Sequence, residues 1–356
     1  MRNTIFKSFI YGLFCITLCI LATEAGVYVF RNHYARVNLP QLVAQDKRDS
    51  VKTAVASTVP TSSRASAHTA FIAASQETKK YAEAVPVILY HGVVKKPDGS
   101  NMVLPQFIEQ MRALKNAGYR TVSMEDFYAF MKGGKQLPEK SFLLTFDDGR
   151  KDSYYPVDPV LEEVGFNAVM FVIVNRMHRD TATKDFHLSV PEYKEILKTH
   201  RWELESHSEN AHNDIVIDLA GNKGRFLANK LWLAGLDRLE TEDEFKARIY
   251  RDLLNAKNTL EREFGISIHA FAFPFGDFGH NSINFPGVEA IVLETARSLY
   301  PMNFYQEWWG KGDAGNYPAG DISMIKRITI KPEWTGENLV QALEKNRLRV
   351  PAGKSL

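Results

Sequence analysis

The sequence predicts an α/β domain built on a parallel sheet, either open or closed into a barrel. Two observations support this class: short, almost continuous apolar segments alternate with amphipathic ones, and polar residues directly follow several of the apolar segments. Strands that are buried on both faces have continuous apolar sequences, and the helices that connect them cover those faces. With 356 residues, 45% of them hydrophobic, the chain is long enough for one large domain with appendages. Its formal net charge of +2 gives no indication of a nucleic-acid partner.

The first 31 residues differ in composition from the rest of the chain. Arg2 and Lys7 precede a long apolar segment, and Arg31 follows it. This pattern is typical of an export signal, either an uncleaved membrane anchor or a signal peptide that is cleaved near Ala25. Because positive charge precedes the segment, both alternatives place the rest of the chain outside the cytoplasm. We therefore expect a cell-envelope protein that is anchored in the membrane through residues 1–31, or secreted if that segment is removed.

Residues 32–80 are predicted to form a flexible tether, because small residues dominate their centre and no apolar period is present. Residues 81–356 form the predicted globular domain. Both cysteines, Cys15 and Cys19, lie in the N-terminal segment. A metal in the globular domain would therefore be held by histidine, aspartate or glutamate.

Strands and helices alternate from residue 85 onward. The predicted strands are residues 85–90, 119–122, 141–146, 168–173, 202–206, 270–273 and 325–330. Helices are predicted around 107–118, after Ser123, up to Gly165, from Pro191 onward, over 241–264 and around 286–298. The helix over 241–264 has the clearest signals, since Thr241 and Glu244 form a capping box and Gly265 ends it.

Two adjacent carboxylates, Asp147 and Asp148, end the apolar segment 141–146 and precede Gly149. Neighbouring side chains alternate along a strand, but at its end both can face one pocket. Two carboxylates placed side by side repel each other unless a cation or a shared proton relieves them. The pattern therefore indicates a metal site that includes a general base.

Two histidines, His207 and His212, follow the predicted strand 202–206. In a parallel sheet they would leave the strand at the same edge as Asp148. Two histidines and one aspartate with an open fourth position are typical of catalytic metal sites. A histidine pair alone is an ordinary surface feature, and it is the combination with Asp148 that favours a metal site.

A tight turn with Pro274 and Gly276 follows the predicted strand 270–273. Such turns expose backbone N–H groups, which can stabilise an oxyanion. The alternative is a turn with a purely structural role.

These three segments resemble the first three motifs of the polysaccharide deacetylases, which are carbohydrate esterase family 4 or the NodB homology domain. The resemblance covers roughly residues 85–335 and keeps the family's motif order. It implies a distorted (β/α)₇ barrel that removes N-acetyl groups from polymers of the N-acetylglucosamine type. By this resemblance Asp147 is the general base, and the backbone N–H of Phe275 helps to bind the oxyanion. The implied metal is divalent, usually zinc, and has three ligands: Asp148, His207 and His212.

The chain departs from the common family pattern in two ways. Its histidine pair is five positions apart instead of four, and no histidine follows His280, so the usual C-terminal Leu-x-His element is absent. Both features are similar to the poly-β-1,6-N-acetylglucosamine deacetylases of biofilm pathways, whose catalytic acid lies in an early strand that ends Tyr-His. Tyr90 and His91 stand at that place here. The resemblance therefore implies that His91 protonates the departing sugar amine, and it favours poly-N-acetylglucosamine as the substrate.

In the family pattern an arginine two positions before the third-motif proline steadies the base, but this chain has Ala272 there. Arg327, in the last predicted strand, is a candidate to replace it by pairing with Asp147 or Asp277. The alternative for Arg327 is a structural salt bridge.

Residues 213–240 form an insertion between the histidine pair and the long helix, and this insertion is too apolar for a free loop. It is predicted either to form a lid or sugar-stacking wall beside the metal, with Trp232 as the contact, or to pack onto the barrel. Trp232 and Arg327 are thus the candidate substrate-binding residues.

Together with the metal site and base that the residues indicate, the resemblance implies a metal-dependent hydrolase that removes N-acetyl groups from a glycan of the cell surface or biofilm matrix, with poly-N-acetylglucosamine favoured by the subgroup features. Peptidoglycan is the alternative substrate, and a non-catalytic glycan-binding protein on the same fold is the alternative class. An ionised base beside a metal favours the enzyme, because a binding module has no use for it. Acid would protonate the base and the histidine ligands, so we expect the rate optimum near or above neutral pH.

Overall fold

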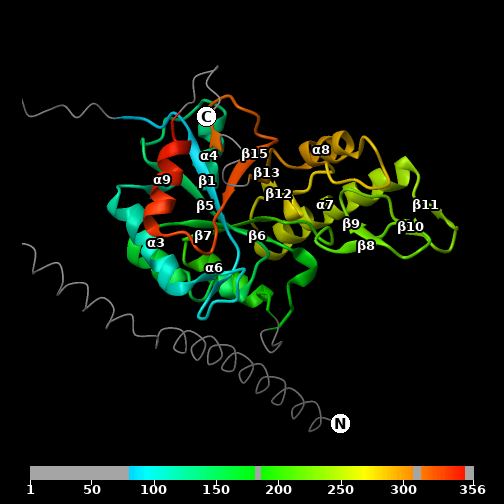
Figure 1. Cartoon of the computed structure of the whole chain (residues 1–356), viewed down its shortest axis with the longest axis horizontal. Helices are drawn as coiled ribbons and strands as arrows, with labels where there is room; N and C mark the ends of the chain where they lie inside the picture. The colour runs from blue at the N-terminus through cyan, green and yellow to red at the C-terminus, as the bar shows by residue number, and fades with distance from the viewer. Residues whose placement is uncertain (1–79, 181–185, 308–313, 349–356) are drawn as a thin grey trace, which may run out of the picture. The chain divides into compact units, whose positions relative to one another are not determined.

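The computed structural model of the chain describes residues 80–180, 186–307 and 314–348 (Figure 1). Apart from Lys80, these residues belong to one compact unit, Tyr81–Leu356. The predicted membrane segment 1–31 lies outside the described residues, as does the tether up to residue 79. Among the described residues, no helix is both long and apolar enough to cross a bilayer.

Seven parallel strands close into a barrel. Their order around the barrel is β1, β15, β13, β12, β7, β6 and β5, and a parallel pairing of β5 with β1 completes the ring. The seven are β1 (Val85–Tyr90), β5 (Ser141–Phe146), β6 (Ala168–Val172), β7 (Trp202–Ser206), β12 (Ala270–Ala272), β13 (Met302–Glu307) and β15 (Ile325–Thr329). The closed form of the predicted sheet is therefore the correct one.

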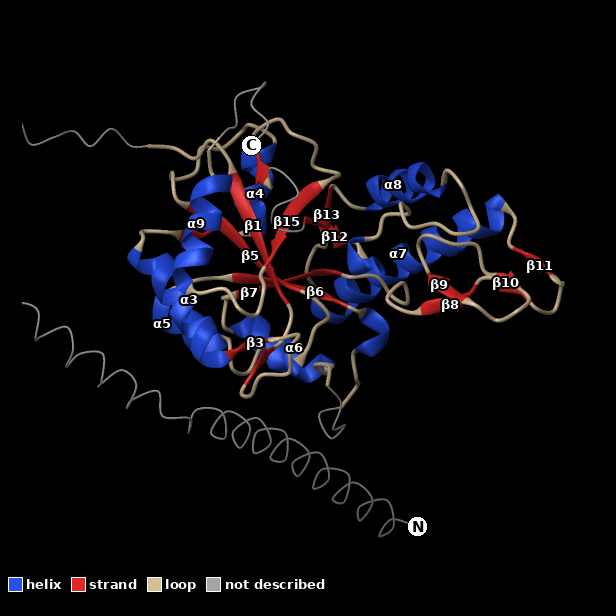
Figure 2. Cartoon of the chain, viewed as in Figure 1, coloured by secondary structure: helices blue, strands red, loops and turns tan. Residues whose placement is uncertain are grey.

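Helices surround the barrel, as Figure 2 shows. They are α3 (Leu104–Asn116), α4 (Met124–Met131), α5 (Asp158–Val164), α6 (Val190–Lys198), α7 (Glu242–Phe264), α8 (Val288–Leu299) and α9 (Gly336–Asn346). Helix α3 packs against α9 and α5, and α7 packs against α8. The capping box predicted for α7 is present, and Gly265 ends the helix in the left-handed conformation at φ 67°.

Alternate residues of the barrel strands form one buried cluster with side chains of α4. Members include Val85 and Val87 of β1, Val169 and Phe171 of β6, and Met302 and Phe304 of β13. Side chains alternate along a strand, and the rings of Phe171 and Phe304, which come from strands that are not neighbours in the sheet, lie 5.3 Å apart between centroids, so this set faces the barrel interior. Continuing the same alternation along β5 and β15 brings Asp147 and Arg327 to the inner side of the barrel mouth.

Short strands complete the fold. Two of them extend the barrel sheet, β4 (Arg120–Thr121) beside β5 and β14 (Gly315–Asn316) beside β1, and β2 (Val93–Val94) pairs with β3 (Met102–Val103). Two hairpins make up most of the insertion at 213–240: β8 (Asp214–Val216) with β9 (Lys223–Arg225), and β10 (Trp232–Leu233) with β11 (Arg238–Leu239).

The predicted strands at 85–90, 141–146 and 202–206 match β1, β5 and β7, and 270–273 and 325–330 match β12 and β15 within one residue. Strand β13 and helix α9 were not predicted. The sequence of β13 mixes aromatic and polar residues and has no apolar run. One of its polar residues, Asn303, is fully buried and donates to the carbonyl oxygen of Tyr300, so a strand interior need not look apolar.

Candidate active site

A pocket of about 580 Å³ opens at the carboxyl ends of the barrel strands. Asp148, His207, His212, Phe275 and His91 all line it. These residues follow four different strands, so the parallel sheet gathers them at one edge as the sequence predicted. The carboxyl edge of such a sheet is where barrel enzymes place their active sites.

The first carboxylate of the pair is held by a buried arginine. Arg327 donates from Nη1 to Asp147 Oδ1 at 2.6 Å and from Nη2 to Oδ2 at 2.8 Å, and neither side chain is exposed to solvent. Burial alone would raise the pKa of Asp147, but Arg327 and the nearby imidazoles hold it below its usual range. Asp147 is therefore ionised near neutral pH. Of the two carboxylates considered as partners of Arg327, it is Asp147 that pairs with it.

The second carboxylate faces the two histidines. Asp148 has a positive φ of 74°, which breaks the strand alternation, so Asp148 lines the pocket while the fully buried Asp147 lies next to it with Oδ2 3.8 Å from His207 Nε2. Its Oδ1 lies 3.2 Å from His212 Nε2 and 3.7 Å from His207 Nε2. Burial raises the pKa of Asp148, but the imidazoles of His212 and His207 outweigh this effect and leave it below its ordinary value. Gly149 follows with φ 70°, and a side chain there would meet the Tyr193 hydroxyl.

One carboxylate oxygen and two imidazole nitrogens, all within 4.8 Å of one another, form a set that fits a divalent metal ion. Asp148 Oδ1 is buried and has no hydrogen-bond partner among the described residues. A buried oxygen of this kind is costly to leave unpaired, and a bound cation would satisfy it. Three protein ligands leave a coordination position open, as catalytic sites require.

The tautomer of His207 suits metal binding. Its Nδ1 lies 2.8 Å from the carbonyl oxygen of Ala272, which can only accept, so Nδ1 carries the proton and Nε2 presents its lone pair to the pocket. Burial lowers the pKa of His207 to about 4. The imidazole is therefore neutral near pH 7, as a metal ligand must be.

The loop that carries both histidines is fixed by Asp252 of α7, a residue that the sequence analysis did not single out. Asp252 is buried and accepts the backbone N–H of Asn210 at 2.7 Å and of Glu209 at 3.2 Å. Ser208, within the loop, has a positive φ of 74°. Two N–H groups directed at one carboxylate set the path of the chain between His207 and His212. The sequence signal that could have indicated Asp252 is its position as a single acidic residue on the buried face of the amphipathic helix α7.

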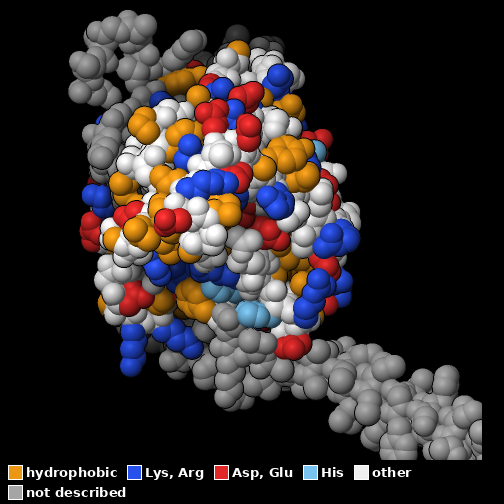
Figure 3. Space-filling view, turned by 90° about the vertical axis from the view of Figure 1, so that its right-hand side faces the viewer, with side chains coloured by type: hydrophobic (Ala, Val, Ile, Leu, Met, Phe, Trp, Pro, Cys, Tyr) orange, Lys and Arg blue, Asp and Glu red, His pale blue; other side chains and the backbone are white. Residues whose placement is uncertain are grey.

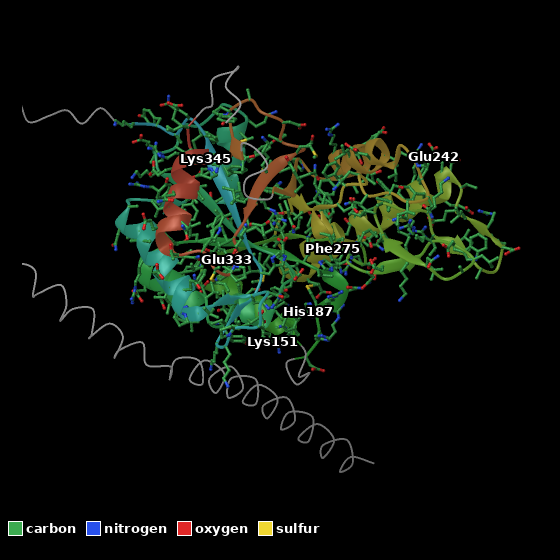
Figure 4. The ribbon with its side chains drawn as sticks, in the orientation of Figure 1. Lys151, His187, Glu242, Phe275, Glu333 and Lys345 are labelled. Carbon is green, nitrogen blue, oxygen red and sulfur yellow. The ribbon has the colours of Figure 1, made fainter. Side chains whose placement is uncertain are left out.

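The turn after β12 places an aromatic ring against the second histidine. Phe275, labelled in Figure 4, has φ 60° and lies with its ring centroid 4.2 Å from that of His212. The turn's own hydrogen bonds are donated by the N–H groups of Gly276 and Asp277. Arg225 of β9 also lies over the Phe275 ring, with its guanidinium carbon 3.6 Å from the ring centroid. The sequence analysis did not single out Arg225.

The remaining predicted residues lie at different distances from the pocket. His91 is half-buried at the end of β1 and lines the pocket. Asp277 stays within its turn, where it accepts the N–H of Gly279 at 2.9 Å. Trp232 is half-buried in β10 and is not among the described residues that line the pocket. Instead, Arg225 is the residue of the insertion that reaches it.

Comparison with known proteins gives matches to both sequence and fold. A family described as polysaccharide deacetylase matches residues 134–285. A curated relative from Escherichia coli (strain K12), named poly-beta-1,6-N-acetyl-D-glucosamine N-deacetylase, is 27% identical over 233 residues, which is 62% of this chain and 32% of the relative. A protein of the same name from Staphylococcus aureus (strain MSSA476) is 28% identical over 171 residues, 48% of this chain and 52% of the relative. The chain thus spans about a third and about half of the length of these two relatives.

Two solved structures match the fold. A de-N-acetylase from Aggregatibacter actinomycetemcomitans matches with a TM-score of 0.60 at 22% identity, covering 73% of this chain and 99% of that one. IcaB from Ammonifex degensii matches with a TM-score of 0.55 at 21% identity, covering 74% of this chain and 97% of that one. At these sequence identities, the two matches show a shared fold.

Proposed function

The chain carries a domain of the polysaccharide deacetylase family, and from that premise we propose that it is a metal-dependent hydrolase that removes N-acetyl groups from poly-β-1,6-N-acetylglucosamine. The observation that supports the proposal most strongly is that the two adjacent carboxylates at the end of β5 have different partners. Asp148 faces two histidines with a metal-binding geometry, while Asp147, one position before, is ionised and held by Arg327. The choice of polymer is supported by the names of the two curated relatives, the five-residue histidine spacing and the position of His91.

The metal would be held by Asp148, His207 and His212, with zinc as the proposed ion. When bound, a divalent cation polarises the amide carbonyl and lowers the pKa of a water molecule. The chain's own part is to keep Nε2 of His207 deprotonated and to fix the histidine loop through Asp252.

Asp147 takes the proton of the attacking water. Its carboxylate is ionised because Arg327 compensates its burial, and the two hydrogen bonds hold its plane in one orientation. Arg327 is fully buried beneath Asp147, so we propose that it acts on the reaction through Asp147 and not by touching the glycan.

Two further groups complete the reaction. The backbone N–H of Phe275 donates to the oxygen that becomes negatively charged when water attacks the acetyl carbon. His91, as an imidazolium, gives its proton to the sugar nitrogen, since an amine cannot leave as an anion. His91 lines the pocket together with the metal-binding residues, which supports this role.

We also propose that the domain works outside the cytoplasm, anchored through residues 1–31 or released after their cleavage. The support is the basic and apolar composition of that segment. The proposed partner is the N-acetylated glycan polymer.

Acetate release from defined oligomers tests the proposed function. Purified protein, stripped with a chelator and then restored with Zn²⁺, is incubated with β-1,6-linked and β-1,4-linked N-acetylglucosamine pentamers and with peptidoglycan fragments. We expect zinc-dependent release that is fastest from the β-1,6 pentamer. Faster release from peptidoglycan fragments would refute the proposed substrate, and release that survives complete chelation would refute the metal-dependent chemistry.

A further inference from the structure

The charges that face the pocket are unbalanced. Apart from the histidines, the aspartate, glutamate, lysine and arginine residues among its described lining residues are Asp148, Arg225 and Lys331. Asp148 is the only carboxylate of that lining, and it is directed at His207 and His212. Arg225 pairs with Asp214, which is not among the lining residues, so the two cations are the charged residues that line the space beyond the metal-binding residues.

Arg225 is held firmly in place. Its guanidinium lies over the Phe275 ring, and Nη1 donates at 3.1 Å to Oδ1 of Asp214, the residue directly opposite Arg225 in the β8–β9 hairpin. Its carbonyl oxygen accepts from Nδ2 of the fully buried Asn229 at 3.2 Å. Both side chains of the ion pair keep more than 40% of their surface exposed, so the guanidinium remains open to a ligand.

The backbone next to Arg225 is tied to the barrel's long helix. Arg248 of α7 donates to the carbonyl oxygens of Phe226 at 2.9 Å and Asn229 at 2.8 Å, and pairs with the buried Glu240. These contacts hold the insertion against α7, and this arrangement places Arg225 at the pocket.

Lys331 approaches the pocket from another element. Lys331 lies just after β15. The N–H of the preceding residue, Ile330, donates to the carbonyl oxygen of Leu89, and the carbonyl oxygen of Lys331 accepts from the N–H of Trp334. Strand β13 separates β15 from β12, whose turn carries Phe275. Arg225 and Lys331 thus stand at separate points of the mouth.

The charge is local to the pocket. On the face of the molecule that carries the hairpins, basic, acidic and apolar side chains are interspersed, and no broad basic surface covers it (Figure 3). With a net charge of only +2, the chain has no strong overall field that would act on a ligand in the same way.

We infer that Arg225 and Lys331 form a cationic rim that favours glycan segments whose amines are still acetylated and disfavours segments that already carry free glucosamine. The inference rests on the proposed function and refines it. Each deacetylation converts a neutral acetamide into an amine that is protonated in mildly acidic solution. A positive charge about 8 Å from another weakens binding roughly twofold to thirtyfold, depending on how much water screens the pair. The rim would therefore slow the reaction next to a finished unit and leave the product partly acetylated.

Binding of a β-1,6 glucosamine pentamer, which has no acetyl group to lose, tests the rim independently of catalysis. Calorimetry on the zinc-loaded protein, at pH about 6 and low salt, compares wild type with Arg225→Gln and Lys331→Gln. Lys223→Gln is the matched control, because it removes one positive charge from an exposed position of the same hairpin, outside the pocket lining. We expect each rim variant to bind the cationic pentamer roughly threefold or more tightly than wild type does, with the gain lost in about 1 M salt. Unchanged or weaker binding in both rim variants would overturn the inference.

Turnover gives a second test on the same proteins. The ratio of kcat/KM for a fully acetylated pentamer to that for a pentamer with one free amine should be high in wild type and should fall in both rim variants. A wild-type ratio near one would overturn the rim while leaving the proposed function intact. If wild type releases no acetate from any oligomer, the proposed function fails, and the binding comparison still decides the rim.

Discussion

Replacing Arg327 should change the protonation of Asp147 more than any other property of the site. The two side chains make two hydrogen bonds of 2.6 and 2.8 Å with no exposure to solvent. Arg327→Met would leave a buried carboxylate without its cation. Breaking a buried ion pair from one side costs about 3–5 kcal/mol of stability. The carboxylate can avoid part of this cost by taking up a proton, so its pKa would rise by several units.

The pH profile of kcat/KM for acetate release measures this effect. For wild type, the pKa of Asp147 is lowered, so the base is ionised throughout the neutral range. We expect the acidic limb of the profile to move to higher pH by about 2 units or more in Arg327→Met. Each unit by which the pKa of the base exceeds the assay pH lowers the rate about tenfold. Arg327→Lys keeps the charge but loses the two-pronged geometry, so its limb should move less.

Stability measurements supply the control. Arg327→Met should cost much less in an Asp147→Asn background, because no buried charge is then left unpaired. Arg238→Met removes a similar two-pronged contact to Glu244 at an exposed site and should change stability little. The reasoning is refuted if the acidic limb of Arg327→Met stays where it is in wild type, or if its stability loss is the same in both backgrounds.

Three further outcomes are expected. Asp252→Ala should weaken zinc binding about 10- to 100-fold in competition titrations, because the histidine loop loses its two N–H contacts. Asp243→Ala, at an exposed position in the first turn of the same helix, should leave zinc affinity unchanged. An equal loss of zinc affinity in both variants would count against the positioning role of Asp252. Gly149→Ala should lower stability by about 1–3 kcal/mol in chemical denaturation, because φ at this position is 70° and the new Cβ would lie 2.0 Å from the Tyr193 hydroxyl. The double variant Gly149→Ala/Tyr193→Phe should recover part of that stability. An unchanged stability in Gly149→Ala would contradict the geometry. Without metal, His207 should contribute a rise in the free energy of unfolding with pH between about 4 and 6.5, since its pKa is about 4 when folded and its unfolded form binds more protons over that interval. The contribution is roughly 3 kcal/mol. Burial raises the pKa of Asp252 to about 6, which acts in the opposite direction, so the difference between wild type and His207→Gln is the measured quantity, and an unchanged slope in His207→Gln would contradict the prediction.

The sequence predicted most of the barrel because its strands and caps have strong local signals. The apolar runs of β1 and β5, the alternating apolar and polar residues of β7 and the capping box of α7 depend on neighbouring residues only, so they can be recognised without tertiary context. Strand β13 lacked such a signal, because it mixes aromatic and polar residues, and the backbone N–H of its buried Asn303 finds its acceptor in the carbonyl oxygen of Ile322, which is distant in the sequence.

The candidate site was predictable to the extent that parallel strands bring their carboxyl ends together. Asp148, His207 and His212 converge for that reason. The way in which two adjacent aspartates both approach His207 was not predictable, since it depends on the left-handed backbone of Asp148. Asp252 and Arg225 could not be singled out either, because each acts through a partner far away in the sequence.

The division of roles between the adjacent carboxylates is the central claim, and zinc binding measured together with turnover tests it most directly. We expect Asp147→Asn to bind one equivalent of zinc with nearly wild-type affinity while its acetate release falls by about 10²–10⁴-fold, the usual contribution of a general base. Asp148→Asn should lose both zinc affinity and turnover. Loss of zinc from Asp147→Asn to the same degree as from Asp148→Asn, or near-normal turnover in Asp147→Asn, would contradict the account.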